Sequence, residues 1–384
     1  MGLLEHKRRL ADDVRLLALS GPPGVCVAIP ACNEAEHIGA CLRALLAQSY
    51  THPFSILIDA NNCTDATAEV VRGIARETPV DVHLRETSDA GAHAPAAVAR
   101  RRSVNAGMEI AGIGGVVLMS DADSAVAPDW IETNVRSIRQ GVDAVCGTIS
   151  PAFAEVVTLP HHVLERGARE FAIEQAHIEV ESLLDGRPWD PWPRHRTESA
   201  ASLACRVNTL VAVGGVPIVE PGEDRELIKL IRRSGGRIRH LLQSQVTTSC
   251  RLEGRARGGW ADDLRERVNS PTGPCHANLE PTSNFVKRIL LRSALRSEWP
   301  KIDIARWSGR LELGASQMHA CLDANEFEDA WARLEAWSPR LVRQRIQADD
   351  IAVEIGRANS VLRRAKSKMR FSETVAQEEM STND

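Results

Sequence analysis

The sequence predicts an α/β protein with a mostly parallel sheet flanked by helices and a helical C-terminal appendage. Short apolar runs of strand length alternate with stretches of helical periodicity over residues 25–120. These apolar runs end at polar residues, and beyond residue 280 the pattern changes to long amphipathic helices. Alternating strands and helices are typical of a parallel sheet that is covered on both faces.

The predicted elements follow one another directly in the chain. Each predicted strand is an apolar run bounded by turn-forming or polar residues, and each predicted helix carries apolar side chains at helical spacing. The strands are predicted at residues 25–29 (VCVAI), 54–58 (FSILI), 80–84 (VDVHL) and 114–120 (GGVVLMS), and the helices at residues 34–47, 64–75 and 95–110.

The length of 384 residues leaves room for one large α/β domain and an addition. The tryptophan-bearing helices near the C-terminus include Trp299, Trp307, Trp331 and Trp337, which could supply an interface, although the oligomeric state is left open. We expect an N-terminal helix over residues 1–23, an α/β domain over 24–270, a helical region over 281–370 and a disordered tail over 371–384.

The composition excludes several function classes. The chain has 47 Lys and Arg against 51 Asp and Glu, a net charge of −4, so no overall basic field would draw nucleic acid. Aromatic residues make up only 4%, too few for a nucleic-acid stacking platform. The nine cysteines contain no CxxC pair, which favours reduced thiols over a zinc site or a disulfide framework.

The hydrophobic pattern predicts a cytoplasmic protein. No signal peptide and no apolar run of about 18 residues occur, so we expect no transmembrane segment. The basic run at residues 363–370 (RRAKSKMR) is compatible with a peripheral contact to an anionic membrane and with a lipid-linked acceptor. A solvated helix face is the favoured interpretation, because no neighbouring span or lipidation signal supports the membrane.

Polar side chains follow three of the predicted strands. They lie in the stretches PACNE (30–34), DANNCTD (59–65) and DADS (121–124). Ligands of such sheets bind beyond the carboxyl ends of the strands. A single aspartate there is more often a turn former or a helix cap, but three such strand ends together favour a site. Asp121 and Asp123 have the spacing at which two carboxylates can approach one Mg²⁺ or Mn²⁺.

Two later stretches also carry polar groups. Residues 187–195 (RPWDPWPRH) contain prolines that predict a loop, and such loops often line binding sites. Glu223 and Asp224 stand at the start of a predicted helix, where the helix dipole favours carboxylates. Simple helix capping explains either carboxylate equally well when it is taken alone.

Taken in order, these motifs resemble those of the family 2 glycosyltransferases. The resemblance covers residues 24–265 and rests on PACNE, DANNCTDAT (59–67), Ala99-Arg100, the DADS stretch with its following PDW, and GEDREL (222–227). It implies a GT-A fold, Mg²⁺ or Mn²⁺, an inverting reaction of the hexosyltransferase type and a nucleotide-diphospho-sugar donor, with a UDP-sugar favoured. The acceptor is an unidentified hydroxyl group.

The resemblance also implies roles for individual residues. Ser199–Ser202 would correspond to the small-residue motif on the acceptor side. On the donor side, Pro30, Asn33 and Glu34 would shape the nucleoside pocket, Asp59 would meet the base and Arg100 would lie near the diphosphate. At the reacting centre, Asp121 would touch the ribose or the water shell of the metal, Asp123 would bind the metal directly, and Asp224 would be the catalytic base, with Glu223 orienting the acceptor.

The chain departs from the family pattern at several places. Cys32 replaces the usual aromatic residue, and Ala60–Cys63 replaces an acidic-Gly-Ser pattern, which leaves base specificity open. The QxxRW signature of processive synthases does not occur, so polymer synthesis is not expected. In its place, Arg251 and Arg255 would either close over the diphosphate or belong to a solvated basic loop. His240 is either a third metal ligand or a structural histidine.

Other functions remain as alternatives. A nucleotidyltransferase of similar fold would require a glycine-rich phosphate loop after the first strand, and PACNEAEH does not offer one. A catalytically inactive GT-A-like scaffold or binding protein would not need Asp121, Asp123 and Asp224 together. A dinucleotide-binding oxidoreductase would show GxGxxG after the first strand, which this sequence lacks.

Overall fold

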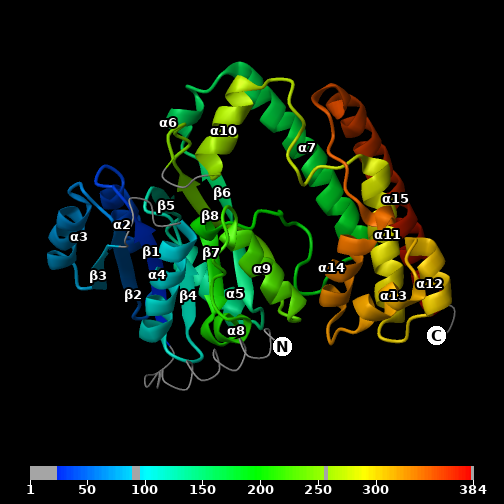
Figure 1. The fold of residues 1–384 in the computed structure, drawn as a ribbon, viewed down its shortest axis with the longest axis horizontal. Coiled ribbons are helices and arrows are strands. Elements are labelled where there is room, and N and C mark those ends of the chain that lie inside the picture. Colours follow the sequence, from blue (N-terminus) through cyan, green and yellow to red (C-terminus); the bar gives the residue numbers. More distant parts are fainter. Residues whose placement is uncertain (1–23, 89–95, 255–257, 382–384) are drawn as a thin grey trace. The chain divides into compact units, whose positions relative to one another are not determined.

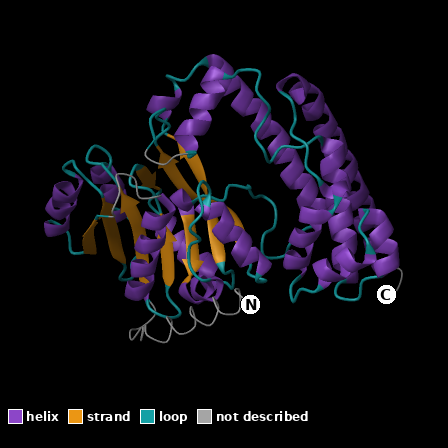
Figure 2. Ribbon diagram, in the orientation of Figure 1, coloured by secondary structure: helices purple, strands orange, loops and turns teal. Residues whose placement is uncertain are grey.

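The protein is described by a computed structural model over residues 24–88, 96–254 and 258–381 (Figure 1). It divides into two compact units. The first unit comprises the described residues up to Thr158 together with Arg196–Arg265, and the second comprises Leu159–His195 and the residues from Glu266 onward. Figure 2 shows that the described strands belong to the first unit and that the second is built from helices and loops. The predicted N-terminal helix lies outside the described residues.

The first unit is built on one eight-stranded sheet with the order β3-β2-β1-β4-β7-β6-β8-β5. Strands β3, β2, β1 and β4 are parallel to one another, β7 runs antiparallel to β4 and β6, β8 is parallel to β6, and β5 is antiparallel to β8. The predicted α/β class is confirmed. The strands are β1 (Val25–Ala31), β2 (Ser55–Asn61), β3 (Asp81–Thr87), β4 (Val116–Met119), β5 (Ser124–Val126), β6 (Ala144–Pro151), β7 (Leu203–Arg206) and β8 (Ile238–Thr248).

Helices cover both faces of this sheet, as the alternating pattern predicted. Successive side chains of β1 enter opposite cores, with Val27 and Ile29 in one and Cys26 and Ala28 in the other. Helices α2 and α5 pack on the first core, and α4, α8 and α9 on the second. The helices are α2 (Ile38–Leu46), α3 (Thr67–Arg76), α4 (Ala96–Ala111), α5 (Trp130–Arg139), α6 (Phe153–Val156), α8 (Val207–Val213), α9 (Glu223–Arg233) and α10 (Trp260–Asn269).

The first two strands are longer than the sequence predicted. β1 continues to Ala31 and β2 continues to Asn61, so Pro30 and Asp59 lie inside their strands and pair with each other in register. The extension of β2 follows from β3, because residues up to Thr87 continue the parallel ladder beyond the apolar run. The prediction that these two residues follow their strands is therefore wrong, because the strands end two and three positions later than predicted.

The second unit is helical. Its longest described helices pack together, α15 against α7 and α11 against both. Trp307 and Trp331 are buried in an apolar core of α11 to α14, whereas Trp337 is about half exposed. The helices are α7 (His161–Leu184), α11 (Thr282–Glu298), α12 (Ile304–Leu311), α13 (Ala315–Leu322), α14 (Phe327–Trp337) and α15 (Ile351–Ser381).

The structure corrects two predicted boundaries. Residues 159–195 belong to the helical unit and not to a continuous 24–270 domain, because α7 buries Ile173 and Val180 against residues beyond 270. The predicted disordered tail at 371–384 is helical as far as Ser381, since its residues are mostly good helix formers. Among the described residues, no helix is both long and apolar enough to cross a membrane.

Candidate active site

The two aspartates of the DADS stretch lie directly after β4. Asp121 binds the guanidinium of Arg100 from α4, which also donates from Nη1 to the carbonyl oxygen of Ser120 at 2.8 Å. Asp123 accepts a hydrogen bond from Thr248 Oγ1 at 3.4 Å, and its Oδ2 lies 3.2 Å from Arg251 Nη2. Each carboxylate therefore faces a different arginine, one from α4 and one from the segment that follows β8.

Arg251 joins the end of β8 to the end of β1. Its two terminal nitrogens bind the two carboxylate oxygens of Glu34 at 2.5 and 3.1 Å. Glu34 is only 5% exposed, and its backbone N–H donates to Thr67 Oγ1 at 2.8 Å. The predicted residues Glu34, Asp123 and Arg251 are thus brought together, although Glu34 and Arg251 lie 217 residues apart in the sequence.

The segment that carries Arg251 is fixed by Glu155 of α6. Glu155 Oε2 accepts hydrogen bonds from Ser249 Oγ at 2.8 Å and from the Cys250 backbone N–H at 2.7 Å. The pairing of β5 with β8 sets Ser124 opposite Thr248 and brings the same segment to the DADS stretch. Sequence reasoning missed Glu155 and Thr248, since neither belongs to a recognisable motif. Arg255 lies outside the described residues.

The predicted base lies at the start of α9. Gly222, with φ of 100°, begins this helix in the left-handed region that glycine adopts readily. Asp224 Oδ2 accepts the backbone N–H of Ala200 at 3.2 Å, so the small residues 199–202 lie beside the carboxylate. Glu223 Oε1 lies 3.9 Å from Arg100 Nε. Arg100 therefore links the Asp121 side of the site to the Glu223 side.

The charges of this cluster perturb one another. Burial raises the pKa of Glu223, and Arg100 opposes the rise. Burial also raises the pKa of Asp123 to about 6, with a further contribution from Asp121, while Arg251 opposes it. Perturbed carboxylates of this kind are typical of functional sites, because desolvation and like charges disfavour the ionised form.

The side chains of Asp121 and Asp123 suit a divalent cation, because carboxylate oxygens are the ligands that Mg²⁺ and Mn²⁺ prefer. Partly buried carboxylates beside one another, as at Asp121 and Asp123, are stabilised when a cation neutralises them. Within the part of the chain that the structure describes, no group of three or more His, Cys, Asp or Glu is arranged to hold a metal. His240 lies in β8 with Nε2 at 3.6 Å from Glu198 Oε1.

Asp59, the predicted base-binding residue, is completely buried. Its Oδ2 lies 2.7 Å from Arg102 Nε and its Oδ1 accepts Thr87 Oγ1 at 2.9 Å. Both oxygens are therefore engaged within the protein. Asn33, with φ of 53°, accepts the Thr64 backbone N–H on Oδ1 at 2.7 Å and so connects the loops that follow β1 and β2.

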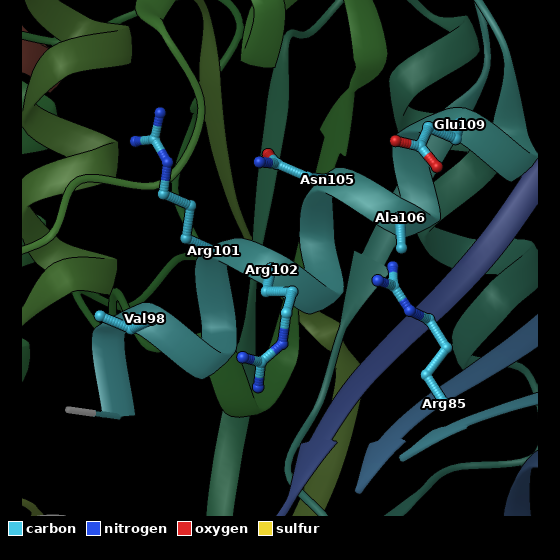
Figure 3. Close-up of a pocket in the computed structure, with 7 residues that line it drawn as sticks. All are labelled: Arg85, Val98, Arg101, Arg102, Asn105, Ala106 and Glu109. Atoms are coloured by element: carbon cyan, nitrogen blue, oxygen red, sulfur yellow. The ribbon is translucent and has the colours of Figure 1, made fainter. Parts of the chain in front are cut away.

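A shallow cavity of about 270 Å³ lies between α4 and β3, beside the ion pair of Asp59 and Arg102 (Figure 3). Three guanidinium groups and one carboxylate line it. Arg101 also donates from Nη1 to the carbonyl oxygen of Val216 at 2.6 Å. The lining residues are Arg85, Val98, Arg101, Arg102, Asn105, Ala106 and Glu109.

One relative of known name is similar to part of this chain. The chain is similar to glycosyltransferase AglE of Haloferax volcanii, with 33% identity over 129 residues that make up 33% of this chain and 40% of that protein. The chain thus matches less than half the length of this relative.

Two solved structures are similar to this chain at low sequence identity. TarS 1-349 of S. aureus in complex with UDP-GlcNAc gives a TM-score of 0.46 at 12% identity, covering 90% of this chain and 92% of that one. Mannosyltransferase PcManGT of Pyrobaculum calidifontis in complex with GDP-Man and Mn²⁺ gives a TM-score of 0.44 at 18% identity. This match covers 87% of this chain and 94% of that one.

The family comparison matches strands β1 to β7 and the residues that follow β1, β2 and β4, whereas β8, Arg251 and Asp224 lie outside the matched residues. The family described as "Glycosyltransferase like family 2" matches residues 22–211, which include Pro30, Asn33, Glu34, Asp121 and Asp123. These are residues for which the sequence motifs implied donor and metal roles. Residues 22–211 of this chain, just under half of its length, are thus similar to the family 2 glycosyltransferases.

Proposed function

We propose that the protein is a metal-dependent, inverting glycosyltransferase that moves a sugar from a nucleotide-diphospho-sugar to an acceptor hydroxyl. The observation that carries the proposal is the position of Arg100, which binds Asp121 and lies 3.9 Å from Glu223. One buried side chain thereby joins the carboxylates of the donor side to those of the acceptor side. A UDP-sugar is the favoured donor.

Asp224 is the proposed base. In an inverting transfer, the acceptor oxygen attacks the anomeric carbon, the bond from that carbon to the diphosphate oxygen breaks, and the acceptor proton passes to a carboxylate. Asp224 Oδ2 is oriented by the Ala200 N–H at 3.2 Å, which supports this role. Glu223, whose pKa burial raises, stands next to it and would orient the acceptor by hydrogen bonding.

Asp123, with Asp121 beside it, would hold Mg²⁺ or Mn²⁺. When bound there, such an ion stabilises the negative charge that grows on the departing diphosphate. Asp123 is already positioned by Thr248, whose hydroxyl lies 3.4 Å from Oδ1. Arg251 would supply a second positive charge to the diphosphate, because a planar guanidinium binds phosphate oxygens in pairs.

The donor's nucleoside would lie against the ends of β1 and β2. Pro30, Asn33 and Glu34 would shape its pocket. Because both oxygens of Asp59 are engaged by Arg102 and Thr87, we propose that Asp59 supports the pocket by fixing the end of β2. This proposal replaces the direct contact between Asp59 and the base that the resemblance implied.

The function is tested with a panel of UDP-, GDP- and dTDP-sugars in the presence of Mn²⁺. A donor that binds the folded chain raises its midpoint of thermal unfolding, and the nucleotide that raises it most identifies the base. D123A should abolish the Mn²⁺-dependent part of this rise. If no nucleotide-sugar binds or is hydrolysed with Mn²⁺ or Mg²⁺, the proposal is wrong.

The base is tested separately by D224N. We expect turnover to fall by about 100- to 10,000-fold, the usual contribution of a general base, while donor affinity stays near that of the wild type. E226Q is the matched control, since Glu226 lies on the same helix and pairs with Lys229 on the surface. Turnover of D224N near the wild-type value would disprove the assignment. A catalytically inactive scaffold would bind donor without transfer in every variant.

A further inference from the structure

Arg251 occupies the position beside Asp123 where a counter-charge is needed. Its Nη2 lies 2.5 Å from Glu34 Oε1 and 3.2 Å from Asp123 Oδ2, and its Nη1 lies 3.1 Å from Glu34 Oε2. The guanidinium thus bridges two carboxylates that are 6% and 18% exposed. Arg251 is therefore a cation that these two carboxylates share.

This position is built into the fold. Glu155 holds Ser249 and Cys250, the two residues before Arg251, at 2.8 and 2.7 Å. The backbone N–H of Arg251 in turn donates to Ser249 Oγ at 3.3 Å. Three hydrogen bonds therefore fix the backbone next to Arg251, and its side chain remains the part of the segment that can exchange partners.

A guanidinium and a divalent cation repel each other at such short range when both approach the same carboxylate. Asp123 Oδ1 already accepts Thr248 Oγ1, and Oδ2 faces Arg251. A cation that binds Asp123 through Oδ2 must therefore displace Arg251 or share that oxygen with it, and one that binds through Oδ1 still meets the repulsion of the guanidinium. A displaced arginine requires a new anionic partner, and a diphosphate offers oxygens that suit its planar fork.

We propose that Arg251 competes with the divalent cation for Asp123, so that the cation binds tightly only together with a nucleotide diphosphate that draws Arg251 away. The inference rests on the proposed function and adds a coupling between the two ligands. Each ligand then raises the affinity for the other by the same factor, as thermodynamic linkage requires. This competition disfavours binding of the metal at Asp123 until the donor is bound.

The coupling is measured with Mn²⁺ as the probe, by electron paramagnetic resonance of the free ion, with and without UDP. In R251M we expect Mn²⁺ alone to bind about five- to tenfold more tightly than in the wild type, and the gain in affinity on adding UDP to shrink. R251K keeps a positive charge and should lie between the two. R136M is the matched control, because Arg136 is exposed on α5 and pairs with Glu132 of the same helix, so its loss should leave Mn²⁺ affinity unchanged.

The outcomes separate the inference from the function on which it rests. Circular dichroism establishes that each variant is folded, and D123N should remove Mn²⁺ binding from both the wild type and R251M. If R251M binds Mn²⁺ alone no better than the wild type does, while UDP still promotes binding, the competition is disproved and the metal-dependent function stands. If the wild type binds no Mn²⁺ with UDP, GDP or dTDP, both the metal-dependent function and the inference fail.

Discussion

Glu198 shows how a single residue next to the candidate site acquires its charge state. Burial disfavours its ionised form, but Arg232 and His240 outweigh that effect and lower its pKa to about 2 from the ordinary value of 4.5. Its Oε1 lies 3.6 Å from His240 Nε2 and also binds Arg232. Because Glu198 directly precedes residues 199–202, this cluster supports the segment that lies beside Asp224.

This shift predicts a pH-dependent stability. A carboxylate whose pKa is lowered by folding stabilises the folded chain fully above its unfolded pKa, and that contribution is lost as pH falls toward the folded pKa. We expect E198Q to lower the free energy of unfolding by roughly 2 to 3 kcal/mol at pH 7, with the difference narrowing from about pH 4.5 to pH 3. Urea unfolding at each pH measures it. A difference that stays constant over this range would contradict the assigned pairing.

The Asp59 pair gives a second prediction at the residue scale. Asp59 is fully buried and Arg102 supplies its charge partner, with Nε 2.7 Å from Oδ2. Removing one member of such a pair leaves an uncompensated buried charge, so R102M should destabilise the protein by about 3 to 5 kcal/mol. Chemical unfolding provides the measurement, and R76M on the neighbouring α3 is a surface control. Unchanged stability would show that the pair does not hold the end of β2.

At the scale of elements, β6 depends on close approach of the segment around Ser202. A Cβ added at Gly147 would overlap Ser202 Oγ and the carbonyl oxygen of Ser244. Trp130 Nε1 donates to the same Ser202 hydroxyl at 2.9 Å, so the neighbours cannot simply move apart. Gly147 thus allows β6, β8 and the segment around Ser202 to pack together.

G147A should therefore destabilise the protein by about 1 to 3 kcal/mol, as overpacking does, and lower its midpoint of thermal unfolding. Gly73 in α3 is the matched control, because a Cβ there meets nothing within 4 Å and alanine favours a helix. G73A should be neutral or stabilising by up to about 1 kcal/mol. Calorimetry of both variants tests this, and equal effects at the two positions would refute the packing argument.

Some of the helices, strands and site contacts could be predicted from the sequence, and others could not. The helices and strands from β1 to β4 were predictable, because continuous apolar runs and helical periodicity alternate there. Strands β5 and β7 were not, since three and four residues carry too little pattern. At the site, motif order placed Asp121 and Asp123 together, but the Glu34–Arg251 contact depends on β8 reaching β5, which no local pattern encodes.

At the scale of the whole molecule, the chain leaves the first unit after Thr158, builds α7 and returns at Arg196. The partners of α7 come from residues far beyond the sheet. Its His177 ring stacks on Phe285 with centroids 4.1 Å apart, and His177 Nε2 lies 3.2 Å from Thr282 Oγ1. The sequence could not predict this, because the helical segment before residue 195 lies between motifs of the α/β unit and carries no signal of its distant partner.

The division of the chain predicts the outcome of truncation. If residues 24–270 were an independent domain, a chain ending at residue 270 would fold. In the structure, Ile173 and Val180 of α7 are buried against Leu279, Phe285 and other residues beyond that point. Each exposed side chain of this size costs about 1.5 to 3 kcal/mol, and an apolar helix face left without its partner promotes association.

We therefore expect the chain truncated after residue 270 to aggregate, or to unfold with lower cooperativity than the full-length protein. Size-exclusion chromatography and calorimetry provide the measurements. The informative partner experiment adds I173S and V180S to the truncated chain, since polar side chains on α7 should reduce aggregation if exposure of this face is its cause. A truncated chain that is monomeric and unfolds cooperatively at the full-length midpoint would show that the sheet unit does not need the helical unit that α7 joins.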